Sequence, residues 1–139
     1  MDEGSRTFDH TGDVGLEVWA ADPARLFARA AEALMALVAD VRGATPTVHR
    51  RVRLDGDDLA DLLVHWLNTV LLESELAHAV WTRAEVHHLG PSVLEASLGG
   101  VPMDRARQTL LREIKAVSQH ALTLELDGPV CRCRLVLDV

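Results

Sequence analysis

The sequence predicts a single domain of the α/β (α+β) class. The expected form is a two-layer sandwich, in which a mixed β-sheet is covered on one face by two amphipathic helices. Three observations predict it. The 139 residues, 48% apolar and 25% charged, suit one compact core spanning residues 1–139. Two segments carry apolar residues at helical spacing. Most of the remaining chain alternates apolar and polar residues as strands do.

The N-terminal part predicts two strands and a helix. Thr7–His10 and Val14–Ala20 have strand-like alternation. Asp22 and Pro23 then predict a helix start, because Asp caps free amides of the first turn and Pro is tolerated at the first helical position. The helix is expected to end near Asp40. Its apolar stripe consists of Leu26, Phe27, Ala30, Ala33, Leu34, Leu37 and Val38.

The next segment predicts a strand and a second helix. In Thr47–Leu54, alternate residues form a mainly apolar face. That face comprises Val48, Arg50, Val52 and Leu54. Asp55-Gly56 is a turn signal, and either Asp57 or Asp58 caps the helix that follows. The helix stripe consists of Leu59, Leu62, Leu63, Trp66, Leu67, Val70 and Leu71.

The C-terminal part is predicted to be mostly strand. Ala79–His88 and Ser92–Leu98 flank a Leu-Gly-Pro connection and form a hairpin. Gly99–Arg107 is expected to be a loop, because it contains Gly, Pro and Asp. Glu113–Leu126 is expected to be extended and central. A final strand, Val130–Val139, follows an Asp-Gly turn.

The charge balance argues against strong, direct binding to nucleic acid. There are 14 basic and 21 acidic residues, which gives a net charge of -7. Nucleic-acid affinity depends on neutralising phosphates with Lys and Arg. The densest basic stretch contains Arg105, Arg107, Arg112 and Lys115, and it is either a local patch or a solvated loop.

Other features favour a cytoplasmic protein. The sequence contains no run resembling a signal peptide and no apolar run long enough to span a membrane. Cys131 and Cys133 alternate along a strand, and residues two apart rarely have disulfide geometry. We therefore expect packing cysteines in a reducing compartment. The oligomeric state is left open by the sequence.

Two acidic segments lie near the chain ends. The run from Asp9 to Gly15 places His10, Asp13 and a hydroxyl in a Gly-containing turn between two strands. Asp13 either bonds its own backbone there or serves a site. In the apolar final strand, Asp138 precedes Val139. Because a strand that continues to its last residue suggests a docked end, Asp138 either faces water or belongs to a site.

Two further segments carry candidate side chains. In Glu113–His120, Lys115 is either extended along apolar surface, paired with an acid or functional, and His120 is either a satisfied polar group or a ligand. On the second helix, Asn68 and Glu73 are candidates for a site at the helix end, or part of a solvated end. No phosphate-binding Gly loop, nucleophile elbow or zinc helix motif is present.

Four segments together resemble the archease family. Asp9 to Gly15 matches the family pattern Asp-His-Thr-Ala-Asp-Val/Ile-Gly, with Gly12 in place of Ala. The pattern Leu-Leu-x-x-Trp-Leu-Asn matches Leu62 to Asn68, and Glu-x-Lys-Ala-x-Thr-x-His matches Glu113 to His120 with Ser118 in place of Thr. The closing Leu-Asp-Val is similar to family C-termini. Departures occur at 69–72 and at Gln119, where the family often has other residues.

The resemblance implies a divalent-metal site. By position it would use Asp13, Asp138 and the terminal residue Val139, with calcium as the expected ion and magnesium or manganese as alternatives. This agrees with the residues, since hard oxygen ligands favour these ions over zinc. The resemblance also implies a functional role for Lys115. We group His10, Glu73 and His120 with it as candidates for activating a partner.

The resemblance further implies the function. Archeases assist the RNA ligase RtcB, promoting its guanylylation and multiple turnover in tRNA splicing or RNA repair. We therefore expect an accessory protein and not an enzyme, with RtcB as its partner. An alternative is a chaperone or specificity modulator of RNA-modifying enzymes such as tRNA methyltransferases, which would use an exposed apolar patch. A metal-dependent hydrolase using His10 or His120 as base is a third alternative.

Overall fold

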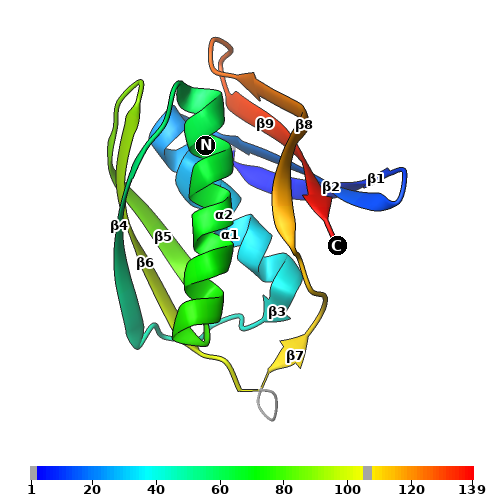
Figure 1. The fold of residues 1–139 in the computed structure, drawn as a ribbon, viewed down its shortest axis with the longest axis vertical. Helices are drawn as coiled ribbons and strands as arrows, with labels where there is room; N and C mark the ends of the chain where they lie inside the picture. Colours follow the sequence, from blue (N-terminus) through cyan, green and yellow to red (C-terminus); the bar gives the residue numbers. More distant parts are fainter. Residues whose placement is uncertain (1–2, 105–107) are drawn as a thin grey trace.

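The structure is a computed structural model that describes residues 3–104 and 108–139. Within these residues lie two helices, α1 (Pro23–Val38) and α2 (Leu59–Ala77). The strands are β1 (Gly4–His10), β2 (Asp13–Ala20), β3 (Ala39–Asp40), β4 (Val48–Asp55), β5 (Ala79–Leu89), β6 (Val93–Pro102), β7 (Thr109–Leu110), β8 (Ala116–Glu125) and β9 (Cys131–Asp138). Figure 1 shows their arrangement.

The strands form two larger sheets. Their strand orders are β1-β2-β9-β8 and β4-β6-β5, and β3 and β7 form a small separate pair. Every pairing in the described ranges is antiparallel. The α+β class is therefore confirmed, but the expected single mixed sheet is wrong. The reason is that alternation within a strand shows which face is buried and not which strand it pairs with.

The helices pack against both sheets. α1 contacts β5 of the three-stranded sheet and β2 of the four-stranded sheet, and α2 contacts β4, β5 and β8. In Figure 1 the three-stranded sheet lies to the left of the helices, and β8 and β9 lie to their right. The prediction of one sheet covered on one face is therefore corrected to two sheets that share the same helices.

The predicted helix starts are confirmed in detail. Asp22 accepts a hydrogen bond from the Arg25 N–H at 2.8 Å, and Pro23 is the first residue of α1. At α2 the cap is Asp58 and not Asp57, since Asp58 accepts from the Asp61 N–H at 2.8 Å. α2 ends before His78, which has a left-handed backbone with φ of 49°.

The core joins the helices to both sheets. Trp66 of α2 is fully buried, and its indole donates a hydrogen bond to the Phe27 carbonyl of α1 at 2.9 Å. The predicted stripes supply most of the buried helix residues. Each buried Leu or Phe side chain contributes roughly 1.5–3 kcal/mol. The apolar stripes therefore fix how the helices lie, as the sequence indicates.

A carboxylate on α1 closes one edge of the three-stranded sheet. Glu32 accepts a hydrogen bond from the Ala84 N–H of the edge strand β5 at 2.9 Å and lies 3.3 Å from the Arg29 guanidinium. Burial raises the pKa of Glu32, and the bond from Ala84 opposes that rise. The helix thus satisfies a backbone group that an exposed edge would leave open.

Two predicted segments differ in the structure. The expected loop at Gly99–Arg107 is wrong for its first part, since β6 continues to Pro102. A Cβ at Gly100 would lie 2.3 Å from the Val80 carbonyl oxygen, so this glycine permits close strand packing and does not mark a turn. Residues 105–107 lie outside the described residues, as do Arg105 and Arg107 of the basic stretch. Glu113–Leu126 becomes strand only from Ala116, in β8 at the sheet edge, so it is not central.

The cysteines behave as expected from the sequence. Cys131 and Cys133 are free and buried on the core face of β9. Burial is the main cause that raises the pKa of Cys133 to about 12 and also raises that of Cys131. Neither α1 nor α2, the helices among the described residues, is long and apolar enough to cross a membrane.

Candidate functional site

The two predicted acidic segments meet at one end of the four-stranded sheet. β2 and β9 are antiparallel neighbours, and their last pair at this end is Val14 with Leu137. The next positions along the two strands are Asp13 and Asp138. Residues directly opposite in an antiparallel pair have Cα atoms roughly 4.5–5.5 Å apart. The register therefore brings early and late carboxylates side by side.

Lys115, the residue before β8, lies at this end of the sheet. Ala116 is the cross-strand partner of Asp138, and the Lys115 N–H donates a hydrogen bond to the Asp138 carbonyl at 2.8 Å. Lys115 and Val139 adjoin this pair, just outside the two strands. Lys115 is exposed, as are Asp138 and Val139. The Lys115 main chain and main-chain oxygen atoms of the last two residues thus lie close to the two carboxylates.

His10 joins the same group from β1. It is the cross-strand partner of Asp13, and its Nδ1 lies 3.8 Å from the Asp13 Oδ2. Nδ1 is buried, and no hydrogen-bond partner accompanies it among the described residues. An unpaired buried imidazole nitrogen costs free energy, so this position favours a further polar group beside Asp13.

A bulge in β8 brings His120 to His10. The pairing of β8 with β9 passes from Ser118 with Val136 to Thr123 with Arg134, so residues 119–122 lie opposite Leu135 alone. Ala121 within this bulge has a φ of 58°, and the Ser118 hydroxyl accepts a hydrogen bond from the His120 N–H. The His120 and His10 rings meet edge to face with centroids 6.3 Å apart.

The bulge was not predicted from the sequence. Its backbone conformation occurs at an alanine, and no Gly, Pro or Asn marks it. β1 and β8 are the two outer strands of this sheet, separated by β2 and β9. The meeting of His10 and His120 therefore depends on an irregularity that strand alternation does not reveal.

Asn68 positions β8 from α2. Its amide nitrogen donates to the Val117 carbonyl at 3.1 Å, and its amide oxygen accepts from the Val117 N–H at 2.8 Å. Asn68 therefore satisfies the outer edge of β8 as a neighbouring strand would. The sequence predicted Asn68 as a residue of a site at the helix end. In the structure it instead holds Val117, two residues along the chain from Lys115.

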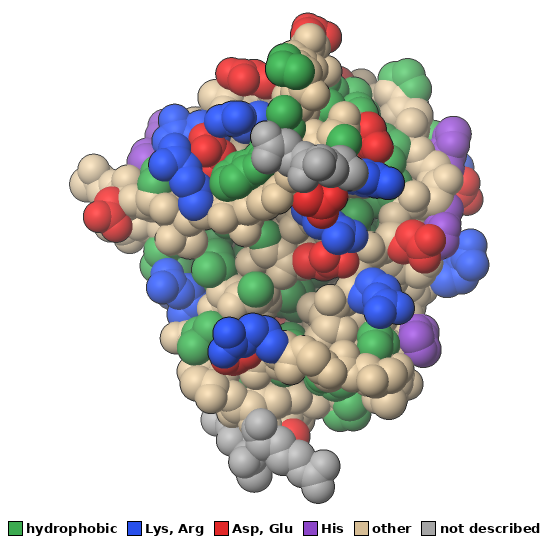
Figure 2. All heavy atoms as spheres, turned by 180° about the vertical axis from the view of Figure 1, so that it is seen from behind, with side chains coloured by type: hydrophobic (Ala, Val, Ile, Leu, Met, Phe, Trp, Pro, Cys, Tyr) green, Lys and Arg blue, Asp and Glu red, His purple; other side chains and the backbone are tan. Residues whose placement is uncertain are grey.

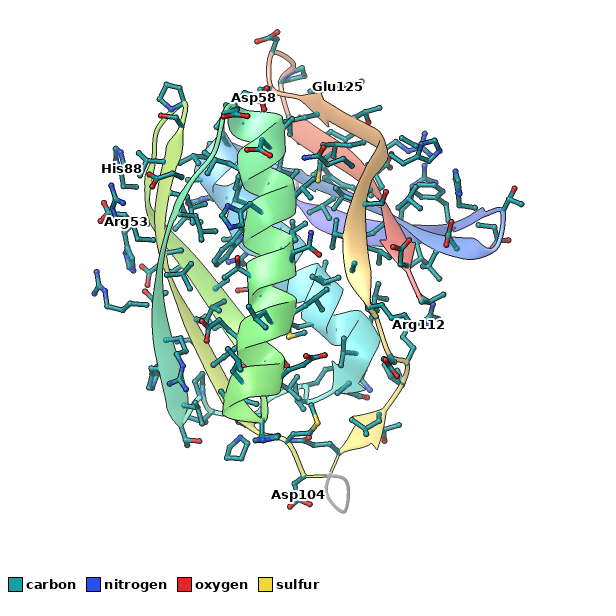
Figure 3. The ribbon with its side chains drawn as sticks, viewed as in Figure 1. Arg53, Asp58, His88, Asp104, Arg112 and Glu125 are labelled. Atoms are coloured by element: carbon teal, nitrogen blue, oxygen red, sulfur yellow. The ribbon has the colours of Figure 1, made fainter. Side chains whose placement is uncertain are left out.

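Glu73 lies elsewhere. Its carboxylate is 3.6 Å from the Arg50 Nε on β4, which belongs to the three-stranded sheet. Asn68 faces β8 whereas Glu73 faces β4, because five residues along a helix turn the side chain to a different side. The structure thus groups Asp13, Asp138, Val139, Lys115, His10 and His120, and it does not bring Glu73 to them. Arg112, of the basic stretch, lies in the segment between β7 and β8 (Figure 3).

The chemistry of the grouped donors fits a hard cation. The carboxylates of Asp13 and Asp138 and main-chain oxygen at Val139 are the ligand type that calcium, magnesium and manganese take. Across residues 3–104 and 108–139, no three His, Cys, Asp or Glu side chains are clustered closely enough to hold a metal. A cation here would therefore need main-chain oxygen or water beside the two carboxylates.

Comparison with known proteins identifies the family. The sequence profile of the Archease protein family (MTH1598/TM1083) matches residues 6–139. The chain belongs to the archease family. Archeases similar to it include that of Methanopyrus kandleri, which is 30% identical with 94% of this chain and 96% of the relative covered. The archease of Sulfurisphaera tokodaii is 25% identical, with 95% and 96% covered.

Solved structures support the archease fold. The solution structure of protein 1598 from Methanobacterium thermoautotrophicum is similar with a TM-score of 0.81, at 22% identity and with 98% of this chain and 99% of that chain covered. The crystal structure of an archease described as a possible chaperone, from Thermotoga maritima, has a TM-score of 0.66 at 20% identity, with 96% of each chain covered. The resemblance inferred from the four segments is therefore confirmed.

Proposed function

We propose that this archease is a non-catalytic accessory protein that promotes guanylylation of the RNA ligase RtcB, and thereby its repeated turnover in tRNA splicing or RNA repair, in the cytoplasm. One observation carries the proposal. Two carboxylates and two imidazoles from β1, β2, β8 and β9 lie together at one exposed end of a sheet, where the Lys115 N–H bonds to the Asp138 carbonyl. Family membership supports assigning that end to the family's accessory role.

The residues suit action on a partner's nucleotide site. Asp13 and Asp138 would hold a divalent cation, calcium or else magnesium or manganese. When bound, such an ion supplies positive charge that counters negative charge developing on a phosphate. The Lys115 backbone is bonded to the Asp138 carbonyl, and its exposed side chain supplies a positive charge at this end of the sheet. Because Asp138 and Lys115 are exposed, a partner surface can reach them without unfolding this chain.

The two histidines lie beside Asp13 at this end of the sheet. His10 lies close to the Asp13 carboxylate, and its ring contacts that of His120. The two rings therefore limit the side-chain conformations that Asp13 can adopt. Groups held in place before a partner arrives lose less conformational freedom on docking. We infer that His10 and His120 act by positioning Asp13 and take no covalent part.

The test is guanylylation of an RtcB ligase. The ligase, GTP and this chain are mixed, and transfer of labelled guanylate to the ligase is followed for the wild type, Asp138→Ala and Asp127→Ala. Asp127→Ala is the control, because it removes the same charge as Asp138→Ala. Asp127 is exposed in the turn before β9, at the end of that strand opposite Asp138. We expect stimulation to fall at least about tenfold for Asp138→Ala only, since one charged ligand is lost. Equal stimulation by all three chains would refute the role of Asp138.

A chaperone-like role is the second candidate. Leu72 and Leu76 on α2 are 52% and 66% exposed, and Leu110 and Leu111 are 39% and 52% exposed. Exposed apolar side chains of this size favour contact with another protein. This role predicts that Leu76→Ser abolishes protection of an RNA-modifying enzyme from aggregation, while Asp13→Ala leaves it intact. The reverse result would exclude it.

A further inference from the structure

The outer face of the four-stranded sheet carries a cluster of arginines. Along β2, Leu16 and Val18 point into the core, so Glu17 points to the opposite face. Glu17 is only 5% exposed. Arg6 of β1 lies 2.8 Å from its carboxylate, Arg134 of β9 lies 3.4 Å away and Arg132 lies 3.8 Å away. Three guanidinium groups from two strands thus surround one buried carboxylate.

Aromatic rings hold two of these arginines in place. The Arg134 guanidinium lies over the Phe8 ring at 4.3 Å from its centroid, and that of Arg132 lies over Trp19 at 5.9 Å. Phe8 in turn covers Gly15, where an added Cβ would lie 2.2 Å from the ring. The rings therefore lie low over the sheet and the arginines lie above them, and cation–π contact fixes their positions.

The three arginines have more N–H donors than the Glu17 carboxylate can accept. The side chains of Arg6, Arg132 and Arg134 are 62%, 45% and 45% exposed. Each guanidinium has five N–H donors, and a single carboxylate cannot accept them all. The three arginines face Glu17 and also Glu125 of β8, the cross-strand partner of Arg132, so these five side chains carry one net positive charge on a chain whose net charge is -7. Figure 2 shows basic side chains gathered with acidic and hydrophobic ones on the four-stranded-sheet side of the molecule.

We propose that this arginine face, defined by Arg6, Arg132 and Arg134, binds the phosphate backbone of single-stranded RNA. Guanidinium groups bind phosphate oxygens in a forked geometry, and their exposed planes accept stacked bases. Arg132 and Arg134 are two residues apart on one strand, so they are roughly 6.7 Å apart along it. An extended polyanion running along β9 can therefore meet both.

The face also leads toward the candidate site. Two residues beyond Phe8 on β1 is His10, and two residues before Gly15 on β2 is Asp13. An RNA strand held over the rings would thus be directed to the end of the sheet where Asp13 and Asp138 lie. The RNA binding itself depends on the arginines alone and is independent of any ligase, so its failure leaves the accessory role standing.

The test is direct binding to RNA. A fluorescein-labelled oligouridine of about a dozen nucleotides is titrated with the chain, and its anisotropy is followed over a range of salt concentrations. With three phosphate contacts, the logarithm of the binding constant should fall with the logarithm of salt with a slope of about -2. Arg134→Gln should reduce the slope by about 0.7 and weaken binding about eightfold at roughly 50 mM salt, because one released counterion is lost.

Matched variants make the result specific. Arg42→Gln has the same charge change at a side chain that is 91% exposed and paired with Asp40, away from this face, so its affinity should stay near that of the wild type. Glu17→Gln removes the opposing charge and should tighten binding, which provides a second variant should Arg134→Gln fail to fold.

Three outcomes would overturn the proposal. The first is no anisotropy change for the wild type at roughly 50 mM salt. The second is equal weakening by Arg42→Gln and Arg134→Gln, or no tightening by Glu17→Gln. The third is competition by a polyglutamate peptide that equals competition by unlabelled oligouridine of the same charge, which would assign the face to an acidic protein.

Discussion

Replacing Asn68 by Ala tests how the candidate site is held together. The change removes both hydrogen bonds to Val117, which are 3.1 Å and 2.8 Å long, and it leaves a backbone N–H and C=O of β8 without their partner. A hydrogen bond contributes about 1 kcal/mol net, and a buried group left unpaired costs about 1–3 kcal/mol. Since Val117 is only 4% exposed, we expect a loss of about 2–4 kcal/mol in the free energy of unfolding.

The measurement is urea unfolding of three chains, with amide hydrogen exchange at Val117. Asn68→Asp keeps the acceptor for the Val117 N–H but places a carboxylate oxygen against the Val117 carbonyl, so it should also be less stable than the wild type. Thr69→Ala, at the next helix position, should change stability by less than about 0.5 kcal/mol. Val117 exchange should speed up most in Asn68→Ala. The reasoning fails if Asn68→Ala is no less stable than Thr69→Ala.

Two further predictions concern Glu32 and Asp13. Burial raises the pKa of Glu32 above its unfolded value of 4.5, so the folded chain binds an extra proton at pH values between the two. The stability that Glu32 contributes is complete below pH 4.5 and is lost as pH rises through the folded pKa. The free energy of unfolding should therefore depend less on pH in Glu32→Gln than in the wild type over that window. An equal pH dependence in the two chains would contradict the burial argument. Calcium titration by calorimetry should give at least about tenfold weaker binding for Asp13→Ala than for Asp127→Ala, whereas equal affinities would remove Asp13 from the ligands.

The helices show how far local patterns reach. Asp22-Pro23 and Asp58 mark helix starts that the structure confirms, because a cap bonds to amides only three residues away. The apolar stripes likewise show which side is buried. The pairing of strands was predicted poorly, since a mixed sheet was expected where all described pairs are antiparallel. Gly100 was taken as part of a loop, although its role is to let β5 approach β6.

In the candidate site, too, some features could be predicted from the sequence and others could not. The segments holding Asp13, Lys115 and Asp138 are visible in the sequence as polar positions in apolar strands, and family resemblance links them. Glu73 was grouped with them because it follows Asn68 on the same helix, but it pairs with Arg50 on the other sheet. The arginine face around Glu17 has no motif, because its members come from β1, β2 and β9 and meet only through strand pairing.

The sequence by itself determined the α+β class, the helix starts, the buried faces and the residue types from which a hard-cation site can be built. These follow from interactions within a few residues along the chain. Tertiary structure alone decided that Asp13 lies beside Asp138, that a bulge at Ala121 brings His120 to His10, and that three arginines enclose Glu17. Such contacts join strands far apart in the sequence, and the free energy that selects their register comes from packing the whole core.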